Sequence, residues 1–183
     1  MRRGAGDRLS TGNDPAASAA DAELARLIAE HSEVVYRLAR SVVRDPALAD
    51  DVTQETMIKA WRALPDWGDD PIPRAWLLRV ARNTAISLLR SRRDDVRSPE
   101  TLPDASGGPA TDTWAADRAA VDDLWLALGR LDETSRSLVV LRELSGLTYE
   151  EIAEVLDLPL STVKTRLFRA RRTLQAQLEE WRP

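Results

Sequence analysis

The residues with the clearest chemical potential lie near the C-terminus, between Leu147 and Leu174. Five cationic side chains occur there with no acidic residue between Leu158 and Leu178: Lys164, Arg166, Arg169, Arg171 and Arg172. At about 100° per residue, an α-helix would place one apolar stripe on its buried side, made of Val163, Leu167, Ala170 and Leu174. The opposite side would carry Lys164, Thr165, Phe168, Arg169 and Arg172. Cations suit phosphate or guanine, and an exposed phenylalanine suits thymine methyl groups and sugar edges.

Two helices joined by a tight turn are expected to hold these side chains. Thr148 and Glu151 have the spacing of a capping box, which predicts the start of the first helix. The Asp157-Leu158-Pro159 sequence ends it, because proline lacks an amide to donate. The pattern predicts a helix-turn-helix whose second helix enters a DNA major groove. The alternative is a helical hairpin with a solvated basic face, which the combination of cap, turn, stripe and unbalanced charge makes the weaker interpretation.

A second candidate site lies on a predicted helix from about Pro73 to Arg93, which has arginines and no acidic residue. One side is apolar, and the other carries Trp76, Arg79, Asn83, Ser87 and Arg90. An aromatic ring, an amide and cations are suited to single-stranded nucleic acid. For Trp76 alone, packing against the preceding loop is the favoured interpretation. That loop, Leu64 to Pro73, contains three prolines and could form a pocket.

A third candidate site is acidic. Asp45-Pro46 predicts the start of a helix that reaches Leu64. Its predicted inward face consists of Ala49, Thr53, Thr56, Met57, Ala60 and Leu64. Its outward face carries Asp50, Asp51, Gln54, Glu55 and Ile58. Acidic residues around an exposed isoleucine suit a basic protein partner. Periodicity alone is equally consistent with a plain solvated face.

Composition limits the classes of function. The 183 residues contain no cysteine and one histidine, which argues against disulfides, thiol catalysis and the usual zinc sites. No metal or other cofactor is expected. No apolar run is long enough for a signal-peptide core or a membrane span, so a cytoplasmic protein is expected. Alanine, leucine and arginine dominate and strand signals are lacking, which predicts an all-α fold. The net charge of −4 is unusual for a DNA-binding protein, but the cations are segregated.

The distribution of proline, glycine and charge predicts two small helical domains. Residues 1–20 are expected to form a disordered leader, and residues 21–93 a first helical domain. Residues 94–117 hold six acidic residues against Arg97 alone, together with prolines and glycines, and are expected to form a flexible acidic linker. Residues 118–183 would form the second domain.

Three segments in this order resemble the extracytoplasmic-function (ECF) group of bacterial sigma factors, the promoter-recognition subunits of RNA polymerase. DPALADDVTQETMIKAW resembles the segment that binds the polymerase clamp. RAWLLRVARNTAISLLRSRR resembles the segment for the −10 promoter element. LRELSGLTYEEIAEVLDLPLSTVKTRLFRARRTL resembles the helix-turn-helix for the −35 element. The resemblance extends from Asp21 to Leu178 with only two sigma domains.

The resemblance implies a role for each site. The Asp50–Ile58 face would bind the clamp helices of the largest polymerase subunit. Asn83 and the loop from Trp67 and Gly68 to Pro73 would read the −10 element and hold a flipped base, while Arg79 and Arg90 contact the backbone. Lys164, Thr165, Phe168 and Arg169 would face the −35 groove. The acidic linker would thread the channel near the polymerase active site.

The sequence departs from the family at two places. The family usually has aspartate where this chain has Ser87, and its loop is commonly richer in small residues than Gly68 to Pro73. Both differences concern which −10 bases are preferred. The partners implied are core RNA polymerase and promoter DNA. Family members are also commonly held inactive by an anti-sigma factor, often membrane-bound, that covers both DNA-facing surfaces. No small-molecule substrate and no membrane insertion are expected.

Three other classes of protein are alternatives to a sigma factor. A helix-turn-helix regulator that binds operators without polymerase would leave the acidic face and the aromatic-basic helix unexplained. A serine acylase would use Ser161 and Lys164 as an S-x-x-K motif, but its companion motifs are missing, so no enzyme is expected. A pure interaction protein, such as an anti-sigma factor, would not need two DNA-reading helices.

Overall fold

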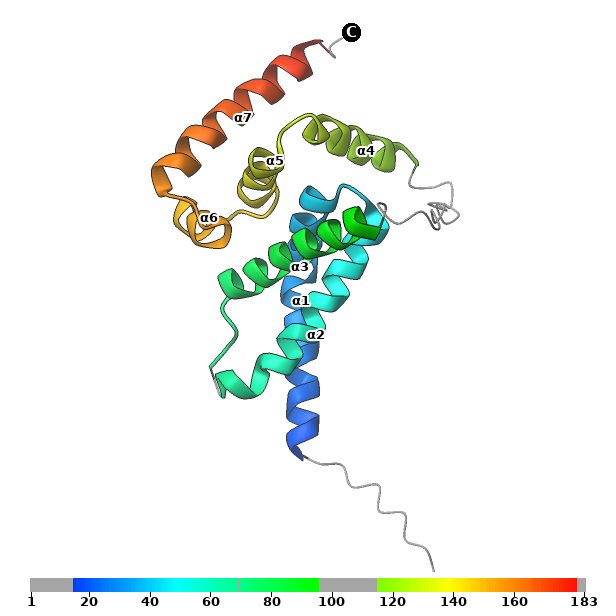
Figure 1. The fold of residues 1–183 in the computed structure, drawn as a ribbon, viewed down its shortest axis with the longest axis vertical. Helices are drawn as coiled ribbons and strands as arrows, with labels where there is room; N and C mark the ends of the chain where they lie inside the picture. Colours follow the sequence, from blue (N-terminus) through cyan, green and yellow to red (C-terminus); the bar gives the residue numbers. More distant parts are fainter. Residues whose placement is uncertain (1–14, 69, 96–114, 181–183) are drawn as a thin grey trace, which may run out of the picture.

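The structure is a computed structural model that describes residues 15–68, 70–95 and 115–180. Helices make up almost all of these segments, as expected (Figure 1). The first unit contains α1 (Pro15–Val43), α2 (Pro46–Trp67) and α3 (Arg74–Asp95). The second contains α4 (Ala115–Gly129), α5 (Glu133–Val139), the π-helical turn η2 (Val140–Leu144), α6 (Tyr149–Leu156) and α7 (Leu160–Glu180).

Several predicted boundaries were wrong by a few residues. Helix α1 begins at Pro15, within the predicted leader, and residues 1–14 lie outside the described residues. Proline suits the first helical turn, and the alanines that follow it favour helix. Helices α3 and α4 likewise extend into both ends of the predicted linker, of which residues 96–114 are outside the described part.

Helix α2 begins where predicted, because the Asp45 carboxylate accepts a hydrogen bond from the Leu48 amide at 3.0 Å. It does not end at Leu64 but continues through Pro65 to Trp67. Leu64 and Trp67 both pack against the core, and this packing offsets the hydrogen bond that Pro65 cannot make. Gly68 then ends the helix at a φ of 58°, a left-handed conformation that glycine adopts without strain.

The core of the first unit forms where α1, α2 and α3 pack side by side (Figure 1). Leu38, Leu77 and Leu78 are fully buried at its centre. Four residues of the predicted inward face of α2 are buried, namely Ala49, Thr56, Met57 and Ala60. The other two, Thr53 and Leu64, are half-buried, and the sequence analysis missed Leu48 and Val52, which are buried.

The second unit packs α5, η2, α6 and α7 around its own set of buried apolar residues. Leu138, Leu141, Ile152 and Leu167 are fully buried there. The four residues come from different elements, so the helix-turn-helix of α6 and α7 is held against the preceding α5–η2 segment. No helix in the described segments is long and apolar enough to span a bilayer.

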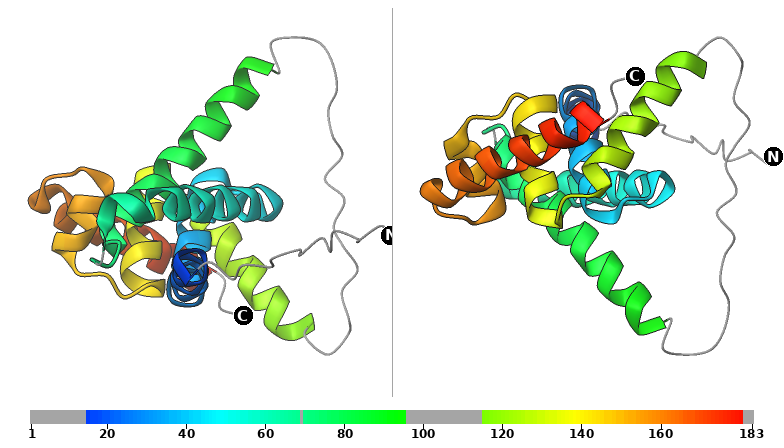
Figure 2. Two further views of the ribbon diagram at one scale, coloured as in Figure 1. Left: turned by 90° about the horizontal axis from the view of Figure 1, so that it is seen from below. Right: turned by 90° about the horizontal axis from the view of Figure 1, so that it is seen from above.

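The two units also pack against each other. A continuous cluster of buried apolar residues runs from Leu38 and Leu77 in the first unit to Leu141 and Ile152 in the second. The Ser41 and Ser137 hydroxyls meet at 2.9 Å between α1 and α5, and Arg74 donates to the Ser145 carbonyl at 3.0 Å. Figure 2 shows α3 and α4 projecting from this shared body in different directions. The two expected domains are therefore in direct contact.

Candidate nucleic-acid and polymerase interfaces

The first candidate site is one side of α7. Val163, Leu167 and Ala170 are buried and Leu174 is half-buried, so the predicted stripe is confirmed. The side chains on the other side are all exposed, and we name them the α7 face: Lys164, Thr165, Phe168, Arg169 and Arg172. Phe168 has 61% of its surface exposed. A large exposed ring beside three cations is the arrangement that a covering ligand would explain.

The turn before α7 is set by local hydrogen bonds. Thr148 and Glu151 form the predicted capping box, in which the Thr148 hydroxyl accepts from the Glu151 amide at 3.2 Å. The Glu151 carboxylate accepts in return from the Thr148 amide at 2.7 Å. The Thr148 hydroxyl also donates to this carboxylate at 2.9 Å, and the two bonds that the carboxylate accepts from Thr148 lower the pKa of Glu151 below its ordinary value. Asp157 ends α6 in the left-handed conformation, with a φ of 53°.

Two of the five cations on α7 are held by carboxylates of the same unit. Arg171 donates to Glu143 at 2.6 and 2.8 Å, which raises the pKa of its guanidinium. Arg166 lies 3.6 Å from the Asp132 carboxylate. Among the residues that the structure describes, Lys164, Arg169 and Arg172 form no ion pair. Within the described segments, the three cations of α7 that have no carboxylate partner therefore all lie on the α7 face.

The second candidate site is one side of α3. Four of its predicted residues are exposed, and we name them the α3 face: Arg79, Asn83, Ser87 and Arg90. They fall within one narrow arc of the helix, because they are spaced by three or four residues. Ala81 and Ala85 on the other side are fully buried in the core. The α3 face can therefore present cations and an amide to a ligand without disturbing the packing of the helix.

Trp67 and Trp76 were predicted to belong to this second site. Their ring centroids lie 6.0 Å apart in an edge-to-face contact, and both rings pack half-buried against the core. The favoured interpretation of Trp76 as a packing residue is confirmed. Trp67 is also a packing residue. Helix α2 continues past Pro65 to Trp67, and the Trp67 ring contacts Trp76 of α3. The pair fixes the start of the loop that follows Trp67 relative to α3.

The third candidate site is the outer side of α2. Asp50, Asp51, Gln54 and Ile58 are exposed as predicted, and Glu55 is partly covered and lies 3.5 Å from Lys59. These five predicted residues form the α2 face. Trp61, which was not among the predicted residues, is 44% exposed and follows Ile58 by one turn. Its position three residues after Ile58 was the signal that could have found it. Together the two side chains form an apolar strip beside the acidic residues.

Metal chemistry has no support within the described residues. In the segments 15–68, 70–95 and 115–180, no three His, Cys, Asp or Glu side chains are grouped so that they could hold a metal ion. The three faces consist of cations, carboxylates, amides and apolar side chains.

Family models match both helical units. The model described as Sigma-70 region 2 matches residues 27–94, and the model described as Sigma-70, region 4 matches residues 122–174. The first match contains the α2 and α3 faces, and the second contains the α7 face. Each face thus lies within a segment whose pattern is shared with other proteins.

Curated proteins and solved structures agree with these models. The chain is 36% identical to the RNA polymerase sigma factor CnrH of Cupriavidus metallidurans over 90% of this chain and 91% of that protein. It is 39% identical to the ECF RNA polymerase sigma factor SigL of Mycobacterium tuberculosis, over 90% of this chain and 94% of that protein. The structure of CnrH with the cytosolic domain of CnrY aligns at a TM-score of 0.64 and 32% identity, over 90% of this chain and 95% of that one. The structure of the sigma factor RpoE in complex with the anti-sigma factor NepR from Bartonella quintana aligns at a TM-score of 0.67 and 25% sequence identity. The alignment covers 86% of this chain and 97% of that one.

Proposed function

The chain belongs to the ECF group of RNA polymerase sigma factors and is a promoter-recognising subunit, and we propose that its three exposed faces divide that work. Residues 21–93, extended at their start by the first turns of α1, would bind core polymerase and the −10 element. Residues 118–183 would bind the −35 element. The linker of residues 94–117 would thread the channel near the polymerase active site, where its carboxylates imitate nucleic acid.

We assign the α7 face to the −35 element. The observation that carries the assignment is the contrast between the fully buried Leu167 and the exposed Phe168 beside it. Lys164, Arg169 and Arg172 would reach phosphates or guanine edges, and Phe168 would cover a thymine methyl group or a sugar. Thr165 already donates its hydroxyl to the Ser161 carbonyl at 2.9 Å, so it would contribute its methyl group and an acceptor oxygen.

We assign the α3 face to the −10 element. Arg79 and Arg90 would hold the backbone of the opened strand, and Asn83 would offer its amide to a base edge. The loop that starts at Gly68 would hold a base flipped out of the stack, which costs a few kcal/mol that its pocket must offset. Trp67 and Trp76 would position that loop through their mutual packing. Ser87 would influence which base is preferred.

We assign the α2 face to the clamp helices of the largest polymerase subunit. Ile58 and Trp61 supply an apolar strip, and Asp50, Asp51 and Glu55 supply acidic charge around it. An apolar centre with a charged rim is the usual anatomy of a protein interface. A helix-turn-helix regulator that works without polymerase would have no use for this strip, so the α2 face favours a sigma factor over that alternative.

The separation of charge would make the sigma factor depend on polymerase for DNA binding. Each basic face neutralises only a few phosphates, and the acidic α2 face repels DNA, so affinity for free DNA should be low. When the α2 face is held on polymerase, the two basic faces act together at high effective concentration. Promoter recognition is then restricted to the assembled holoenzyme.

We also propose where the chain acts and what restrains it. Transcription takes place in the cytoplasm, and no described helix could span a membrane. The related CnrH and RpoE structures each contain a bound partner, CnrY or the anti-sigma factor NepR, so an anti-sigma factor is expected here. The chain itself would not be an enzyme, because Lys164 belongs to the DNA-facing side and Ser161 to the first turn of α7.

Site-specific photocrosslinking tests these assignments directly. A p-benzoylphenylalanine at position 168 should crosslink to −35 DNA in a complex of core polymerase, this chain and a cognate promoter. The same probe at position 83 should crosslink to the −10 strand. At Ile28, which is exposed on α1 and belongs to none of the three faces, it should crosslink to neither element. Crosslinking to the elements from position 28 but not from 168 or 83 would reject the assignments.

A further inference from the structure

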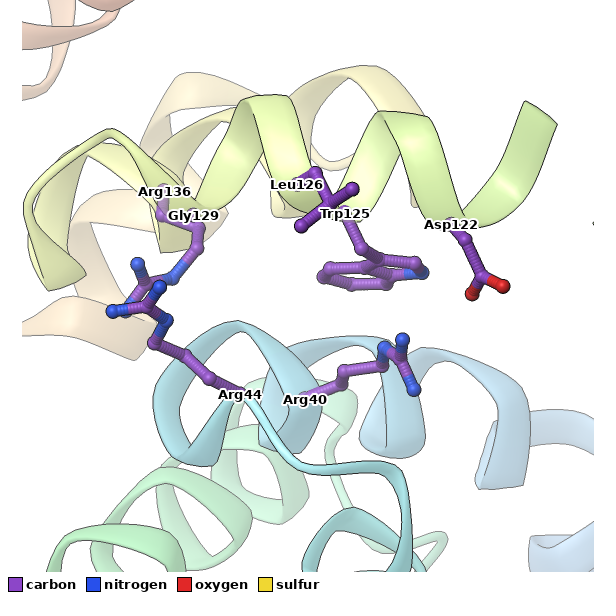
Figure 3. A pocket seen from close by; sticks show the side chains of 7 residues that line it. All are labelled: Arg40, Arg44, Asp122, Trp125, Leu126, Gly129 and Arg136. Atoms are coloured by element: carbon purple, nitrogen blue, oxygen red, sulfur yellow. The ribbon is translucent and has the colours of Figure 1, made fainter. Parts of the chain in front are cut away.

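A pocket between the two units is lined by three arginines and is not part of any face described above. It lies between the C-terminal end of α1 and the inner side of α4, with a volume of about 280 Å³ (Figure 3). Arg40 lies in the last turn of α1, Arg44 directly follows that helix, and Arg136 comes from α5. Trp125 and Leu126 of α4 supply an apolar wall.

The pocket has a clear excess of positive charge. Asp122 is the one carboxylate among its lining residues, which leaves two net positive charges from three guanidinium groups. In the described part of the chain, none of the three arginines has a carboxylate oxygen within 4.0 Å. Figure 3 shows the Arg44 and Arg136 guanidinium groups next to each other at one end of the pocket. Burial, and then the nearby Arg44 charge, lower the pKa of Arg136.

Two of the three arginines, Arg136 and Arg40, are held in place by the surrounding structure. Arg136 is only 4% exposed and donates to the carbonyls of Ser41 and, at 3.1 Å, Leu131. Arg40 lies over the Trp125 ring, 4.9 Å from its centroid. A fixed guanidinium loses little side-chain entropy when it binds an anion, so these arginines are arranged in advance for a ligand.

The backbone also accommodates this crowding of cations. Arg44 has a φ of 66°, a left-handed conformation that is unfavourable for a residue with a β-carbon. Gly129 makes room for its side chain, because a β-carbon there would lie 3.1 Å from a terminal nitrogen of Arg44. Arg40 and Arg44 are four residues apart, a spacing at which like charges repel. Strain, repulsion and a close approach at one place are features typical of a binding site.

We propose that this pocket binds a small phosphoryl-bearing anion between α1 and α4. Guanidinium groups match the oxygens of phosphate through paired hydrogen bonds. Two net positive charges favour a phosphoryl group, which carries up to two charges, over a single carboxylate. Trp125 and Leu126 would contact a carbon-containing part of the ligand. The ligand would contact both units, so it would stabilise their packed arrangement by binding it in preference to the separated one.

Calorimetric titration of the full chain with pyrophosphate, at constant ionic strength, tests the proposal. Wild type should show saturable binding, and pyrophosphate should raise its Tm in a concentration-dependent manner. Arg44→Gln and Arg40→Gln should each weaken binding about tenfold or more, because each removes a charge-assisted hydrogen bond. Arg62→Gln is the matched control: Arg62 is exposed on α2, outside the pocket, and its loss should leave the affinity unchanged.

Gly129→Ala tests the geometry without removing a charge. The new methyl group would lie 3.1 Å from the Arg44 guanidinium and shift it by a few tenths of an ångström, so pyrophosphate should bind more weakly while the unliganded Tm stays equal or rises. Acetate should bind wild type at least about tenfold more weakly than pyrophosphate if the site selects phosphoryl groups. Absence of saturable binding, equal affinities in all variants, or equal binding of acetate would overturn the proposal.

Discussion

Leu167 and Phe168 are neighbours in α7, yet Leu167 is completely buried and Phe168 is 61% exposed. The helix turns by about 100° between them, so one enters the core and the other faces solvent. This relationship separates the effect of a substitution on stability from its effect on DNA binding. A substitution on the α7 face can therefore test DNA binding without unfolding the helix.

We expect Phe168→Ala to change the free energy of unfolding by about 0.5 kcal/mol or less, because little packing is lost at an exposed site. It should lower transcription from −35-dependent promoters and relax specificity at one base pair. Leu167→Ala is the matched control and should cost about 2–5 kcal/mol, since it leaves a cavity in the core. Urea unfolding and transcription assays on both variants check the prediction. The reverse order of stabilities would contradict the assigned sides of α7.

The α2 face should be sensitive to the sign of its charge. Asp51→Lys combined with Glu55→Lys should leave the helical circular dichroism spectrum unchanged but weaken binding to core polymerase by about tenfold or more. The Glu55–Lys59 ion pair that is lost is exposed and contributes little stability. Asp123→Lys, an exposed charge reversal on α4, is the control and should retain affinity in a fluorescence titration. Equal loss in the control would point to net charge alone.

Asn83 should act on strand opening and not on the −35 contact. Asn83→Ala removes an exposed amide, so stability should be kept. Permanganate reactivity of the opened −10 bases should fall, while protection of the −35 element in a footprint should persist. Normal permanganate reactivity would show that Asn83 does not read the −10 strand. Loss of both signals would indicate a folding defect.

The capping box before α6 should make stability depend on pH. Hydrogen bonds from Thr148 keep the folded-state pKa of Glu151 below its ordinary value of 4.5. The stabilisation from the carboxylate is therefore present above pH 4.5 and is lost as the pH falls through the lower folded-state pKa. Glu151→Gln should destabilise the chain at neutral pH, and the difference from wild type should shrink on acidification. Urea unfolding at several pH values measures the free energy of unfolding of both proteins. A stability difference between them that grows on acidification would contradict this account.

Local sequence signals predicted the local structure well. The cap at Asp45, the capping box of Thr148 and Glu151, and the stripe that contains Leu167 each depend on residues within about two turns of one another. Such patterns involve residues that are close in the sequence, so they can be recognised without knowledge of the tertiary structure. The exposure of the α7, α3 and α2 faces followed from the same periodicity.

Features that depend on distant residues could not be predicted in this way. The burial of Arg136 requires the carbonyl of Ser41, and the packing of Trp67 requires Trp76 on another helix. The continuation of α2 through Pro65 opposes local propensity and depends on tertiary contacts. Contact between the two units is likewise non-local, so composition predicted two helical domains but not the buried cluster that they share.

Transcription in vitro tests the central claim most directly. Purified core polymerase would be mixed with this chain and a library of promoters in which the −35 and −10 positions are randomised. We predict initiation only when the chain is present, from promoters that share two sequence elements. Phe168→Ala should alter the selected −35 bases alone, and Asn83→Ala the −10 bases alone. Initiation that is indifferent to both elements, or no initiation above core polymerase, would contradict the account.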